Sequence, residues 1–469
     1  MDVMLVFPRS SGYMFSGNPP LGIAYIAAVL RRDGFDTGIT DIGIDFLDDK
    51  KGFVSFLKEK RPKIIGFSVL TEQYPYAREL ITEIKHEMPD VKIVAGGPHV
   101  TLKKGKLLAE TPGIDFLVYG EGEMTMLELS RHLLKGKGDL SGIDGIIYRK
   151  NGIVTNKPRQ LISDLDGLPL PARDMLKMSD YRGSLTILTS RGCPYQCIYC
   201  SSHLWLGRGW RSRSPESVIS ELEMLLSTYP EEFKKRPLTI LDDAFNINMD
   251  RAKKICDMMI ERELKFTWVC ATGLRANLVD RELLEKMKRA GCAMINYGIE
   301  STDDSVLEKI KKGEKLEEIR NAIRLTKEIG ITVGGYFILD LPGMNMQKAK
   351  EMAKTMKELD LDKIVLNMVA PYEGTELWDY VHTPGVKILR DLDIPLWDSP
   401  NFETVEFTAA EKMEAFKYLC RVRNRIMLKN TLRPGRLIPG LMRTRTKAEF
   451  IRKTKHLFML AFERKARNF

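Results

Sequence analysis

Three of the seven cysteines lie within eight residues, in the segment Arg191-Gly-Cys193-Pro-Tyr-Gln-Cys197-Ile-Tyr-Cys200. In a chain with so few cysteines, a Cys-x3-Cys-x2-Cys spacing at the end of an expected strand indicates a metal or cluster site. Thiolates are the natural protein ligands of iron–sulfur clusters. Three of them leave one iron of a 4Fe–4S cube open to a ligand that is not protein, which suits chemistry at that iron.

A zinc site is the main alternative for these thiols. Zinc takes four ligands and usually draws them as two pairs. The other cysteines, Cys256, Cys270, Cys292 and Cys420, are scattered singly, as is typical of small buried hydrophobic residues, and form no second pair. His203 is available as a fourth ligand, so zinc stays open as an alternative.

The first 130 residues alternate short apolar strands with amphipathic helices. Strands are expected at 3–8, 37–43, 64–70, 92–97 and 116–120, and helices at 20–33, 50–60, 75–88, 103–110 and 123–135. This alternation predicts a doubly wound, Rossmann-like parallel sheet covered on both faces. Glycine-containing turns follow two of the strands, at 96–99 and 120–123, and indicate a ligand at the carboxyl edge of the sheet.

A second strand–helix series begins near residue 184. Its strands are expected at 184–190, 238–243, 266–272, 293–300, 332–340 and 363–370. Six such units predict a partial (β/α)6 barrel with its active residues at the carboxyl ends of the strands. A β-hairpin at 143–156, turning at Asn151-Gly152, and a linker at 163–174 are expected between the two series.

We therefore expect an α/β protein in four parts. Residues 1–140 form the Rossmann-like domain, 141–180 the hairpin and linker, 181–378 the partial barrel, and 379–469 a basic, mainly helical C-terminal domain.

The composition excludes several classes of protein. Hydrophobic residues make up 43% of the 469 residues and charged residues 29%, close to the averages of soluble globular proteins. No apolar run is long enough to span a membrane, and the N-terminus lacks the layout of a secretory signal. Seven cysteines are too few for a secreted disulfide scaffold. A cytoplasmic protein without a transmembrane segment is expected.

The net charge of +10 belongs to the C-terminal tail. Residues 421–469 hold 15 Lys and Arg against two acidic residues, so the preceding chain sums to −3. Aromatic and basic residues interleave in 456–469, a pattern typical of an amphipathic helix that docks on an anionic surface. Anionic lipid, an acidic partner protein and packing on the barrel stay open for this tail, and no nucleic acid is expected.

Taken in order, these motifs resemble the radical S-adenosylmethionine family. The cysteine motif, with Tyr199 before its last cysteine, looks like the family signature. Further matches follow on successive strand ends, at DDAF (242–245), Arg275 and Asn277, GIES (298–301), GYFILDLPG (335–343) and PYEGT (371–375). The N-terminal half resembles the cobalamin-binding domain of one subgroup of that family, and the resemblance covers residues 2–378.

The resemblance implies three cofactors, a 4Fe–4S cluster, S-adenosylmethionine and cobalamin. The cluster and the catalytic role fall to Cys193, Cys197 and Cys200. The residues implied for S-adenosylmethionine are Tyr199, near the adenine, and Asp242, Asp243, Arg275, Glu300 and Ser301. Helix capping or a structural ion pair is the alternative for their charged members.

The resemblance also implies a cobalamin-binding edge. Its residues are Asn18, Pro20, Leu21, Gly22, Ser68, Leu70, Thr71, Gly96, Gly97, His99, Gly120, Glu121, Gly122 and Glu123. The Asp-x-His-x-x-Gly motif that supplies a histidine to cobalt in other cobalamin proteins is absent. We therefore expect cobalamin bound without a protein histidine, and His99 packed beside it.

The activity that the resemblance implies is C-methylation. In that family the open iron chelates S-adenosylmethionine, whose one-electron cleavage gives a 5′-deoxyadenosyl radical that abstracts hydrogen from an unactivated carbon, and methylcobalamin donates the methyl group. Cobalamin-dependent cyclases or oxidases share every motif and stay open as an alternative. Methylthiotransferases carry three further N-terminal cysteines, which are absent here.

The substrate is expected to be large or amphiphilic, since the C-terminal region is long and basic. A peptide or protein side chain is expected, of the kind modified by the glutamine C-methyltransferase of methyl-coenzyme M reductase, with a hopanoid-type lipid next. Tyr336, Asn367 and Tyr372 are expected to line the substrate cavity, with core packing equally open. An electron donor such as ferredoxin or flavodoxin and an anaerobic cytoplasm are also implied.

Overall fold

The computed structural model describes residues 1–9, 17–47, 49–181 and 183–433. The chain divides into two compact units: unit 1 comprises Met1–Pro194 and Ser201–Asp242, and unit 2 comprises Tyr195–Cys200 and Asp243–Phe469. The helix expected at 456–469 lies outside the described residues. None of the helices in the described ranges is long and apolar enough to cross a membrane.

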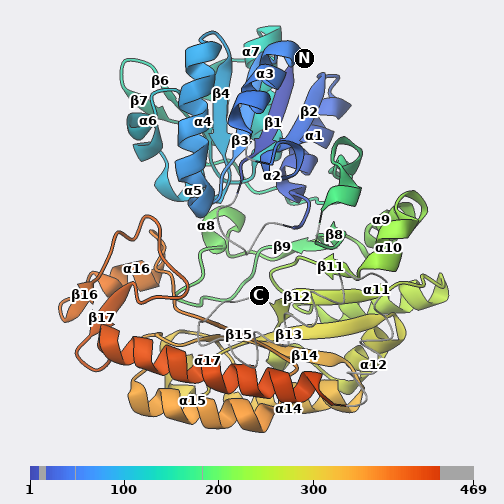
Figure 1. Cartoon of the computed structure of the whole chain (residues 1–469). Coiled ribbons are helices and arrows are strands. Elements are labelled where there is room, and N and C mark those ends of the chain that lie inside the picture. The colour runs from blue at the N-terminus through green and yellow to red at the C-terminus, as the bar shows by residue number, and fades with distance from the viewer. Residues whose placement is uncertain (10–16, 48, 182, 434–469) are drawn as a thin grey trace. The chain divides into compact units, whose positions relative to one another are not determined.

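Unit 1 contains a seven-stranded sheet in the order β2-β1-β3-β4-β5-β6-β7 (Figure 1). The five parallel strands are β1 (Val3–Phe7), β2 (Thr37–Asp41), β3 (Ile64–Ser68), β4 (Lys92–Gly96) and β5 (Phe116–Val118). They confirm the five expected strands. The expected hairpin is also present, as β6 (Ile146–Arg149) and β7 (Ile153–Thr155), but β6 pairs antiparallel with β5 and so continues the sheet.

Helices cover both faces of this sheet, as its parallel topology requires. One core contains side chains of α1 (Leu21–Arg32) and α7 (Gly122–Lys135), and the other contains side chains of α3 (Lys50–Lys60), α4 (Tyr74–Glu87), α5 (Pro98–Lys103) and α6 (Lys106–Glu110). A short α2 (Ile42–Asp45) follows β2. The single helix expected at 103–110 is wrong, because Lys104 adopts a left-handed conformation (φ 48°) and separates α5 from α6.

Short strands and three helices make up the rest of the described part of unit 1. These are β8 (Thr186–Ile187), β9 (Ser190–Arg191), α8 (His203–Leu206), β10 (Arg211–Ser212), α9 (Pro215–Thr228), α10 (Pro230–Lys235) and β11 (Leu238–Ile240). β8 pairs in parallel with β11, and β9 pairs antiparallel with β10. The expected strand at 184–190 is thus two short strands, because the backbone N–H of Thr189 donates to the Asp242 carboxylate instead of to a neighbouring strand.

Unit 2 contains four adjacent parallel strands, β12 (Trp268–Leu274), β13 (Cys292–Glu300), β14 (Thr332–Ile338) and β15 (Lys363–Asn367). Its helices are α11 (Met249–Glu261), α12 (Arg281–Arg289), α13 (Asp304–Lys309), α14 (Leu316–Glu328), α15 (Met346–Leu359), α16 (Glu376–Val381) and α17 (Ala409–Thr431). An antiparallel pair, β16 (Val386–Ile388) and β17 (Phe402–Thr404), precedes α17. Each of the six strands expected in the second series is at least partly present.

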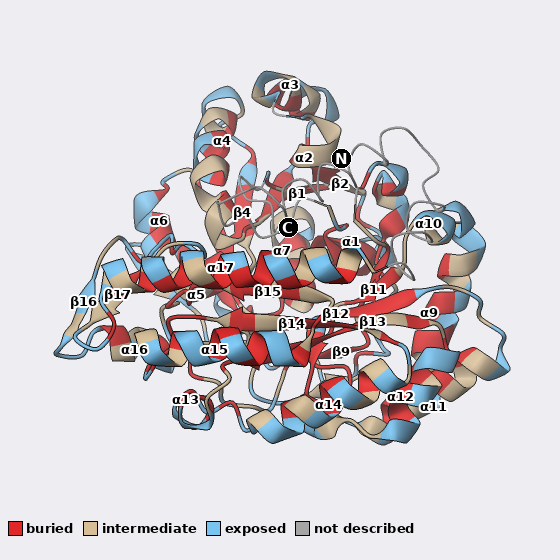
Figure 2. Cartoon of the chain, turned by 60° about the horizontal axis from the view of Figure 1, so that its bottom comes forward, coloured by how far each residue is buried: buried red, intermediate tan, exposed pale blue. Residues whose placement is uncertain are grey.

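The last described helix, α17, packs along α15 and buries one face (Figures 1 and 2). Its Lys412 is 1% exposed, donates to the carbonyl of Phe402 at 2.8 Å, and lies 3.5 Å from the buried Asp340 carboxylate. Asp340 follows β14 and also accepts the backbone N–H of Val369 at 2.6 Å. Burial lowers the pKa of Lys412 and raises the pKa of Asp340. The C-terminal helix is therefore tied to the end of β14 by a buried charge.

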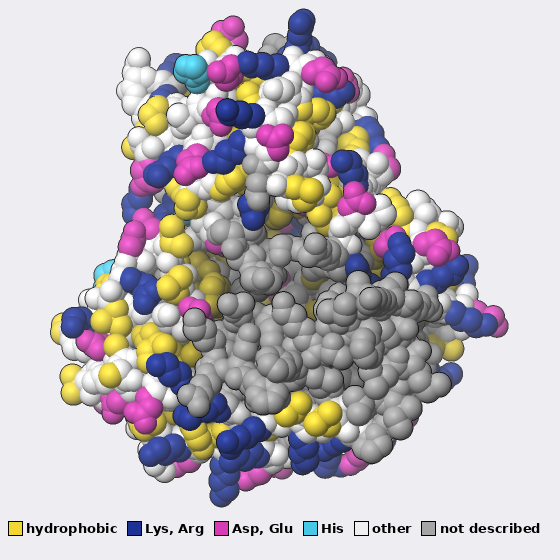
Figure 3. All heavy atoms as spheres, viewed as in Figure 1, with side chains coloured by type: hydrophobic (Ala, Val, Ile, Leu, Met, Phe, Trp, Pro, Cys, Tyr) yellow, Lys and Arg dark blue, Asp and Glu magenta, His cyan; other side chains and the backbone are white. Residues whose placement is uncertain are grey.

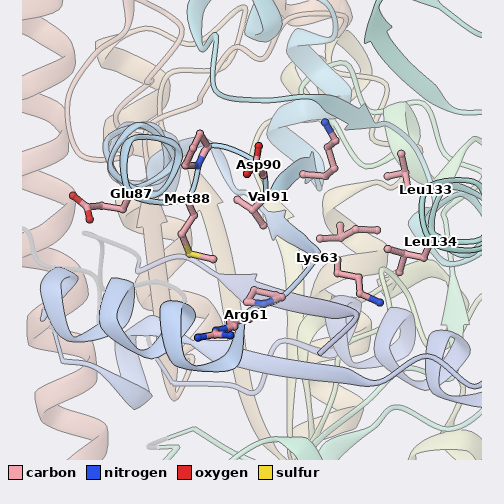
Figure 4. Close-up of a pocket in the computed structure, with 12 residues that line it drawn as sticks. Arg61, Lys63, Glu87, Met88, Asp90, Val91, Leu133 and Leu134 are labelled. Carbon is pink, nitrogen blue, oxygen red and sulfur yellow. The ribbon is translucent and has the colours of Figure 1, made fainter.

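A surface pocket of about 610 Å³ lies at the amino ends of β3 and β4 (Figure 4). Arg61, Lys63, Glu87 and Asp90 contribute charges of both signs to its lining. Ligands of parallel sheets bind at the opposite, carboxyl edge. This pocket is therefore separate from the edge that carries the expected cobalamin residues.

A buried carboxylate in α9 joins two arginines in unit 1. Glu221 is 0% exposed and lies 2.7 Å from the guanidinium of Arg173. Its other oxygen accepts from Arg213, which also donates to the carbonyl of Leu188 at 3.1 Å. Arg173 donates to the carbonyl of Thr186 at 2.7 Å. The triad thus fixes the interdomain linker and α9 to the segment around β8.

Replacing Glu221 by Gln would leave two buried guanidinium groups without their shared negative charge. Removing one partner of a buried ion pair lowers the free energy of unfolding by roughly 3–5 kcal/mol. We therefore expect a clearly lower Tm for E221Q than for the wild type in thermal unfolding. E223Q, at an exposed position of the same helix, is the matched control and should leave the Tm almost unchanged. Equal Tm values for E221Q and the wild type would contradict the assignment.

Candidate active site

The carboxyl ends of β3 and β4 approach each other closely at Gly97. Gly97 has a φ of +95°, and a Cβ at this position would lie 2.8 Å from the backbone N of Val69. The N–H of Val69 donates to the carbonyl of Gly96 at 2.9 Å, and the N–H of His99 donates to the carbonyl of Val69 at 3.1 Å. Only glycine fits this close contact, which brings together Ser68 and the residues on either side of Gly97.

His99 is buried at this edge of the sheet. It is 3% exposed, its Nδ1 lies 3.3 Å from Thr71 Oγ1, and its ring lies 4.5 Å from the ring of Tyr74. The side chain of Gln73 accepts the N–H of Leu70 at 2.9 Å and donates to the carbonyl of Pro8 at 2.6 Å. The turn after β3 is therefore fixed both to α5 and to the end of β1.

The remaining predicted cobalamin residues lie at the same edge or at the start of α1. Gly120, after β5, has a φ of +78°, and its N–H donates to Thr101 Oγ1 at 3.0 Å. Pro20 and Leu21 are buried at the N-terminus of α1, and Gly22 is exposed there. Asn18 accepts the N–H of Ser184 at 3.2 Å.

The two carboxylates of the Gly120–Glu123 turn bind arginines. Glu121 and Glu123 are buried, and their oxygens lie 2.9 Å and 2.7 Å from the guanidinium of Arg191. Arg211 approaches Glu121 at 2.9 Å, and the N–H of Ile162 donates to the same carboxylate at 2.8 Å. Burial opposes the charge of Arg191, but Glu123 and Glu121 outweigh burial and raise its pKa. The sequence pattern gave no sign of this pairing, which fixes the residue two positions before Cys193.

Asp242, which follows β11, supports the same segment. Its buried carboxylate accepts the N–H and the hydroxyl of Thr189, the former at 2.6 Å, and the hydroxyl of Ser190 at 2.7 Å. The carboxylate of Asp242 thus accepts hydrogen bonds from the protein itself. This favours a structural role for Asp242 over a direct contact with S-adenosylmethionine. Asp243 is partly exposed in unit 2.

The cysteine loop runs from unit 1, which contains Cys193, into the Tyr195–Cys200 segment of unit 2. Within unit 2, the N–H of Ile198 donates to the carbonyl of Ile310 at 3.1 Å, and the N–H of Leu377 donates to the carbonyl of Ile198 at 2.9 Å. The three thiols of the motif are partly exposed and form no disulfide. Across the described ranges, no three His, Cys, Asp or Glu side chains surround one position suitable for a single metal ion.

A buried group of four charged side chains lies beside the cysteine loop in unit 2, and we call it the Lys312 group. It comprises Lys312, Glu300, Glu314 and Arg275, each 8% exposed or less. Lys312 Nζ lies 3.6 Å from Glu300 and 3.3 Å from Glu314, and Arg275 lies 3.5 Å from Glu314. Burial raises the pKa of Cys197, and the charges of Lys312 and Arg275 oppose this increase.

Two tyrosines of the cysteine loop contact the Lys312 group directly. The guanidinium carbon of Arg275 lies 3.5 Å from the ring centroid of Tyr195, a cation–π contact. The hydroxyl of Tyr199 hydrogen-bonds the Glu300 carboxylate. Arg275 also donates to the carbonyls of Lys312 and Gly313, both at 2.8 Å. Arg275 and Glu300 are therefore brought to the cysteine loop, and Lys312 and Glu314 are charged residues there that the sequence analysis missed.

The other predicted residues of unit 2 occupy strand ends. Ser301 is fully buried after β13, and its hydroxyl lies 3.9 Å from the sulfur of Met344. The partly exposed Tyr336 accepts the side-chain amide of Asn296 at 3.1 Å and donates to the carbonyl of Ala271. Asn367 ends β15 and is partly exposed. The ring of Tyr372 lies 6.2 Å from that of Trp397, a contact that the sequence analysis did not foresee.

The residues present fit two of the three expected cofactors, the iron–sulfur cluster and cobalamin. Three partly exposed thiols are a donor set suited to an iron–sulfur cluster, and the two of them in unit 2 belong to the segment that contacts the buried Lys312 group. The glycine-dependent close approach at Gly97, next to the turn at Gly120, is suited to a large planar ligand at the carboxyl edge of the unit 1 sheet.

Comparison with known families assigns both halves of the chain. Residues 16–130 match the B12 binding domain, and residues 187–356 match the radical SAM superfamily. The chain is 34% identical over 392 residues to an uncharacterized methyltransferase of Pyrococcus horikoshii, covering 81% of this chain and 83% of that protein. It is 28% identical to the anaerobic magnesium-protoporphyrin IX monomethyl ester cyclase of Synechocystis sp., covering 81% and 78%.

Solved structures show the same fold. The cobalamin-dependent S-adenosylmethionine radical enzyme OxsB, solved with aqua-cobalamin and S-adenosylmethionine, aligns with a TM-score of 0.76 at 19% identity, covering 98% of this chain and 71% of OxsB. The radical S-adenosylmethionine methyltransferase TsrM of Kitasatospora setae, solved with cobalamin and a [4Fe-4S] cluster, aligns with a TM-score of 0.71 at 21% identity, covering 88% and 84%. With its B12 binding domain, its radical SAM domain and a 34% identical relative along most of its length, the chain belongs to the family of cobalamin-dependent radical S-adenosylmethionine methyltransferases.

Proposed function

We propose that this methyltransferase methylates an unactivated carbon in a peptide or protein side chain. When bound, the cluster and S-adenosylmethionine supply a radical that abstracts hydrogen, and cobalamin supplies the methyl group. One observation supports the use of the cluster and cobalamin in the same reaction. It is the ion pairing of Glu121 and Glu123 with Arg191. It joins the turn after β5, at the cobalamin edge, to the residues that lead into Cys193.

The chain's own residues contribute positioning and charge. Gly97 permits the close approach of β3 and β4, and Asp242 fixes the residues that precede the cysteine loop. Arg275 and Lys312 provide positive charge beside the loop in a region from which most water is excluded. Glu300, oriented by Tyr199 and Lys312, stays a candidate for binding S-adenosylmethionine.

An apolar surface in unit 2 supports a large substrate. Ile388, Ile394, Leu396, Trp397 and Val405 are each at least 37% exposed, and Figure 3 shows hydrophobic side chains gathered over α16, β16 and β17. The carbonyl of Trp397 accepts the N–H of Met368 at 2.8 Å, so this surface adjoins the carboxyl end of β15. Exposed apolar side chains that gather on one surface are typical of a contact site.

Among large substrates we favour a peptide, such as one containing the glutamine of methyl-coenzyme M reductase. A hopanoid-type lipid is the second candidate, because the same apolar surface would also contact a lipid. A cyclase or oxidase reaction is the second candidate for the chemistry, since the similarity to the Synechocystis cyclase extends over 81% of this chain.

The accessory partners follow from the same chemistry. We propose a low-potential electron donor such as ferredoxin or flavodoxin, and an oxygen-poor cytoplasm, because the cluster must be reduced and is oxygen-labile. On the face of unit 1 seen in Figure 3, acidic and basic side chains are mixed. This face of unit 1 therefore offers no surface of a single charge to a partner. We propose that an anionic surface of another molecule contacts the basic C-terminal tail instead.

The first test measures two products of S-adenosylmethionine. We expect the anaerobically reconstituted protein, given cobalamin and a low-potential reductant, to form both 5′-deoxyadenosine and S-adenosylhomocysteine. Changing Cys193, Cys197 and Cys200 to Ala should abolish 5′-deoxyadenosine, whereas C420A, which removes a buried thiol of α17, should retain it. 5′-Deoxyadenosine without S-adenosylhomocysteine would favour the cyclase reaction and contradict methyl transfer.

The second test concerns the cobalamin edge. In G97A the new Cβ would strain the left-handed backbone and press on Val69, at a cost of roughly 1–3 kcal/mol, so we expect cobalamin to bind about tenfold more weakly or worse. The Kd is measured by absorbance titration. G142A, where a Cβ meets nothing within 4 Å, is the control and should bind as the wild type does. An unchanged Kd for G97A would place cobalamin elsewhere.

The third test concerns the substrate. Methyl-deuterated S-adenosylmethionine is supplied with a glutamine-containing peptide or with hopanoid vesicles, and the label is located by mass spectrometry. We expect label in the peptide and a KM for it raised about tenfold by W397A, since tryptophan is enriched among the contact residues whose truncation costs more than about 1 kcal/mol. I153A, at an exposed position of unit 1, should leave the KM unchanged. Label in the lipid alone would overturn the peptide proposal.

A further inference from the structure

Lys312 is a lysine that the fold buries at considerable cost. It follows α13, is 7% exposed, and its ammonium lies between two carboxylates, 3.3 Å from Glu314 and 3.6 Å from Glu300. Lysines are almost never buried unless they are paired. Burial would lower the pKa of Lys312, but Glu300 and Glu314 outweigh burial and raise it. The side chain is therefore a fixed positive charge in the interior of unit 2.

The two carboxylates have different sets of partners. Glu314 is bound to the residues after β12, because its Oε1 accepts the N–H of Ala276 and lies 3.5 Å from Arg275. Glu300 faces the cysteine loop, where it accepts the hydroxyl of Tyr199. Arg275 and Glu314 thus compensate each other, and Lys312 with Glu300 forms the pair on the side of the loop.

The end of β13 leaves room for this pair. A Cβ at Gly298 would lie 2.7 Å from Glu300 Oε1 and 2.9 Å from Lys312 Nζ. Glu300 itself adopts a left-handed conformation, with a φ of +60°, at an irregularity in the pairing of β13 with β14. A non-glycine residue in this conformation costs of order 1–3 kcal/mol and is typical of functional sites. The glycine at 298 and the left-handed backbone of Glu300 together allow the Glu300 carboxylate and the Lys312 ammonium to lie side by side. Both interrupt the regular geometry of β13.

Lys312 lies beside the cysteine loop. A Cβ at the neighbouring Gly313 would lie 3.7 Å from the ring of Tyr195, and the hydroxyl of Tyr199 hydrogen-bonds Glu300, which the ammonium of Lys312 approaches to 3.6 Å. A fixed cation beside the loop favours an added electron on the cluster that the loop binds. In a region of low dielectric constant this effect is much larger than in water.

We propose that Lys312 sets the reduction potential of the cluster held by the cysteine loop, by fixing a positive charge beside that loop. The inference rests on the proposed function, because it takes the cluster to be present. The step concerned adds one electron from an external low-potential reductant to the oxidised cluster, whose negative charge rises by one. Glu300 has the opposite effect, since its carboxylate partly cancels the charge of Lys312.

The test measures the potential of the cluster in reconstituted full-length protein without S-adenosylmethionine. Iron and sulfide contents are determined first, and the one-electron couple is then followed by electron paramagnetic resonance during a redox titration. We expect K312M to lower the equilibrium constant for reduction at least tenfold, which corresponds to a potential more negative by about 59 mV. K312R, which keeps the charge, should remain close to the wild type.

Two further variants separate charge from structural damage. E300Q removes the opposing carboxylate, so the potential should become more positive, opposite to the effect of K312M. K253M removes another ion-paired lysine of unit 2, whose partners are Asp280 and Glu282, and should leave the potential unchanged. Loss of packing alone would not shift the potential in opposite directions in K312M and E300Q.

An unchanged potential in K312M, or shifts of the same sign in K312M and E300Q, would overturn the inference. If K312M fails to retain iron, the comparison of E300Q and K312R with the wild type decides the question, since only a charge effect moves the first and spares the second. A wild-type protein that binds no iron would contradict the proposed function itself, whereas an iron-loaded protein with an insensitive potential would contradict this inference alone.

Discussion

The pairing of Arg191 with Glu121 and Glu123 is the interaction on which the proposed active site depends most. It lies within one unit, is buried, and joins the turn after β5 to the residues that lead into the cysteine loop. Buried ion pairs contribute little net stability compared with apolar packing, but leaving one partner unpaired is costly. The pairing therefore favours one arrangement of the two segments over all others. Asp242, which follows β11, adds to this by satisfying Thr189 and Ser190 immediately before Arg191.

The elements of the fold could largely be predicted from the sequence, because their signals are local. Strands such as Ile64–Ser68 are short apolar runs between glycine or proline and an amphipathic helix, and periodicity alone identifies them. The pairing of β6 with β5 could not be predicted, since the hairpin shows its turn but not the edge on which it docks. Alternation of Ile146, Ile147 and Tyr148 between the two cores of the sheet becomes apparent only once that edge is known.

The candidate site could be predicted less completely than the fold, because charged residues that are buried in ion pairs look in the sequence like exposed surface residues. Arg275 and Glu300 were identified because they lie at strand ends within motifs of a known family. Lys312 and Glu314 follow a helix in a run of charged residues, Lys311-Lys312-Gly313-Glu314, which reads as a solvated surface. Lys312 and Glu314 are buried because the chain after α13 packs back against the end of β13, where Glu300 lies. No local sequence pattern encodes this contact. Conversely, Glu121 and Asp242 were predicted as cofactor ligands, whereas their carboxylates here bind the protein itself.

The attachment of α17 has a consequence for the order of events during synthesis. Asp340 lacks its cation until Lys412 has been made, because that lysine pairs with it from α17. The cysteine loop likewise receives its supports late, since Ile198 hydrogen-bonds Ile310 and Leu377, residues made more than a hundred positions after it. Domains generally fold from the N-terminus as they leave the ribosome. Unit 1 can therefore build most of its sheet early, whereas the contacts that hold the cysteine loop in unit 2 have to await synthesis of the residues up to Leu377.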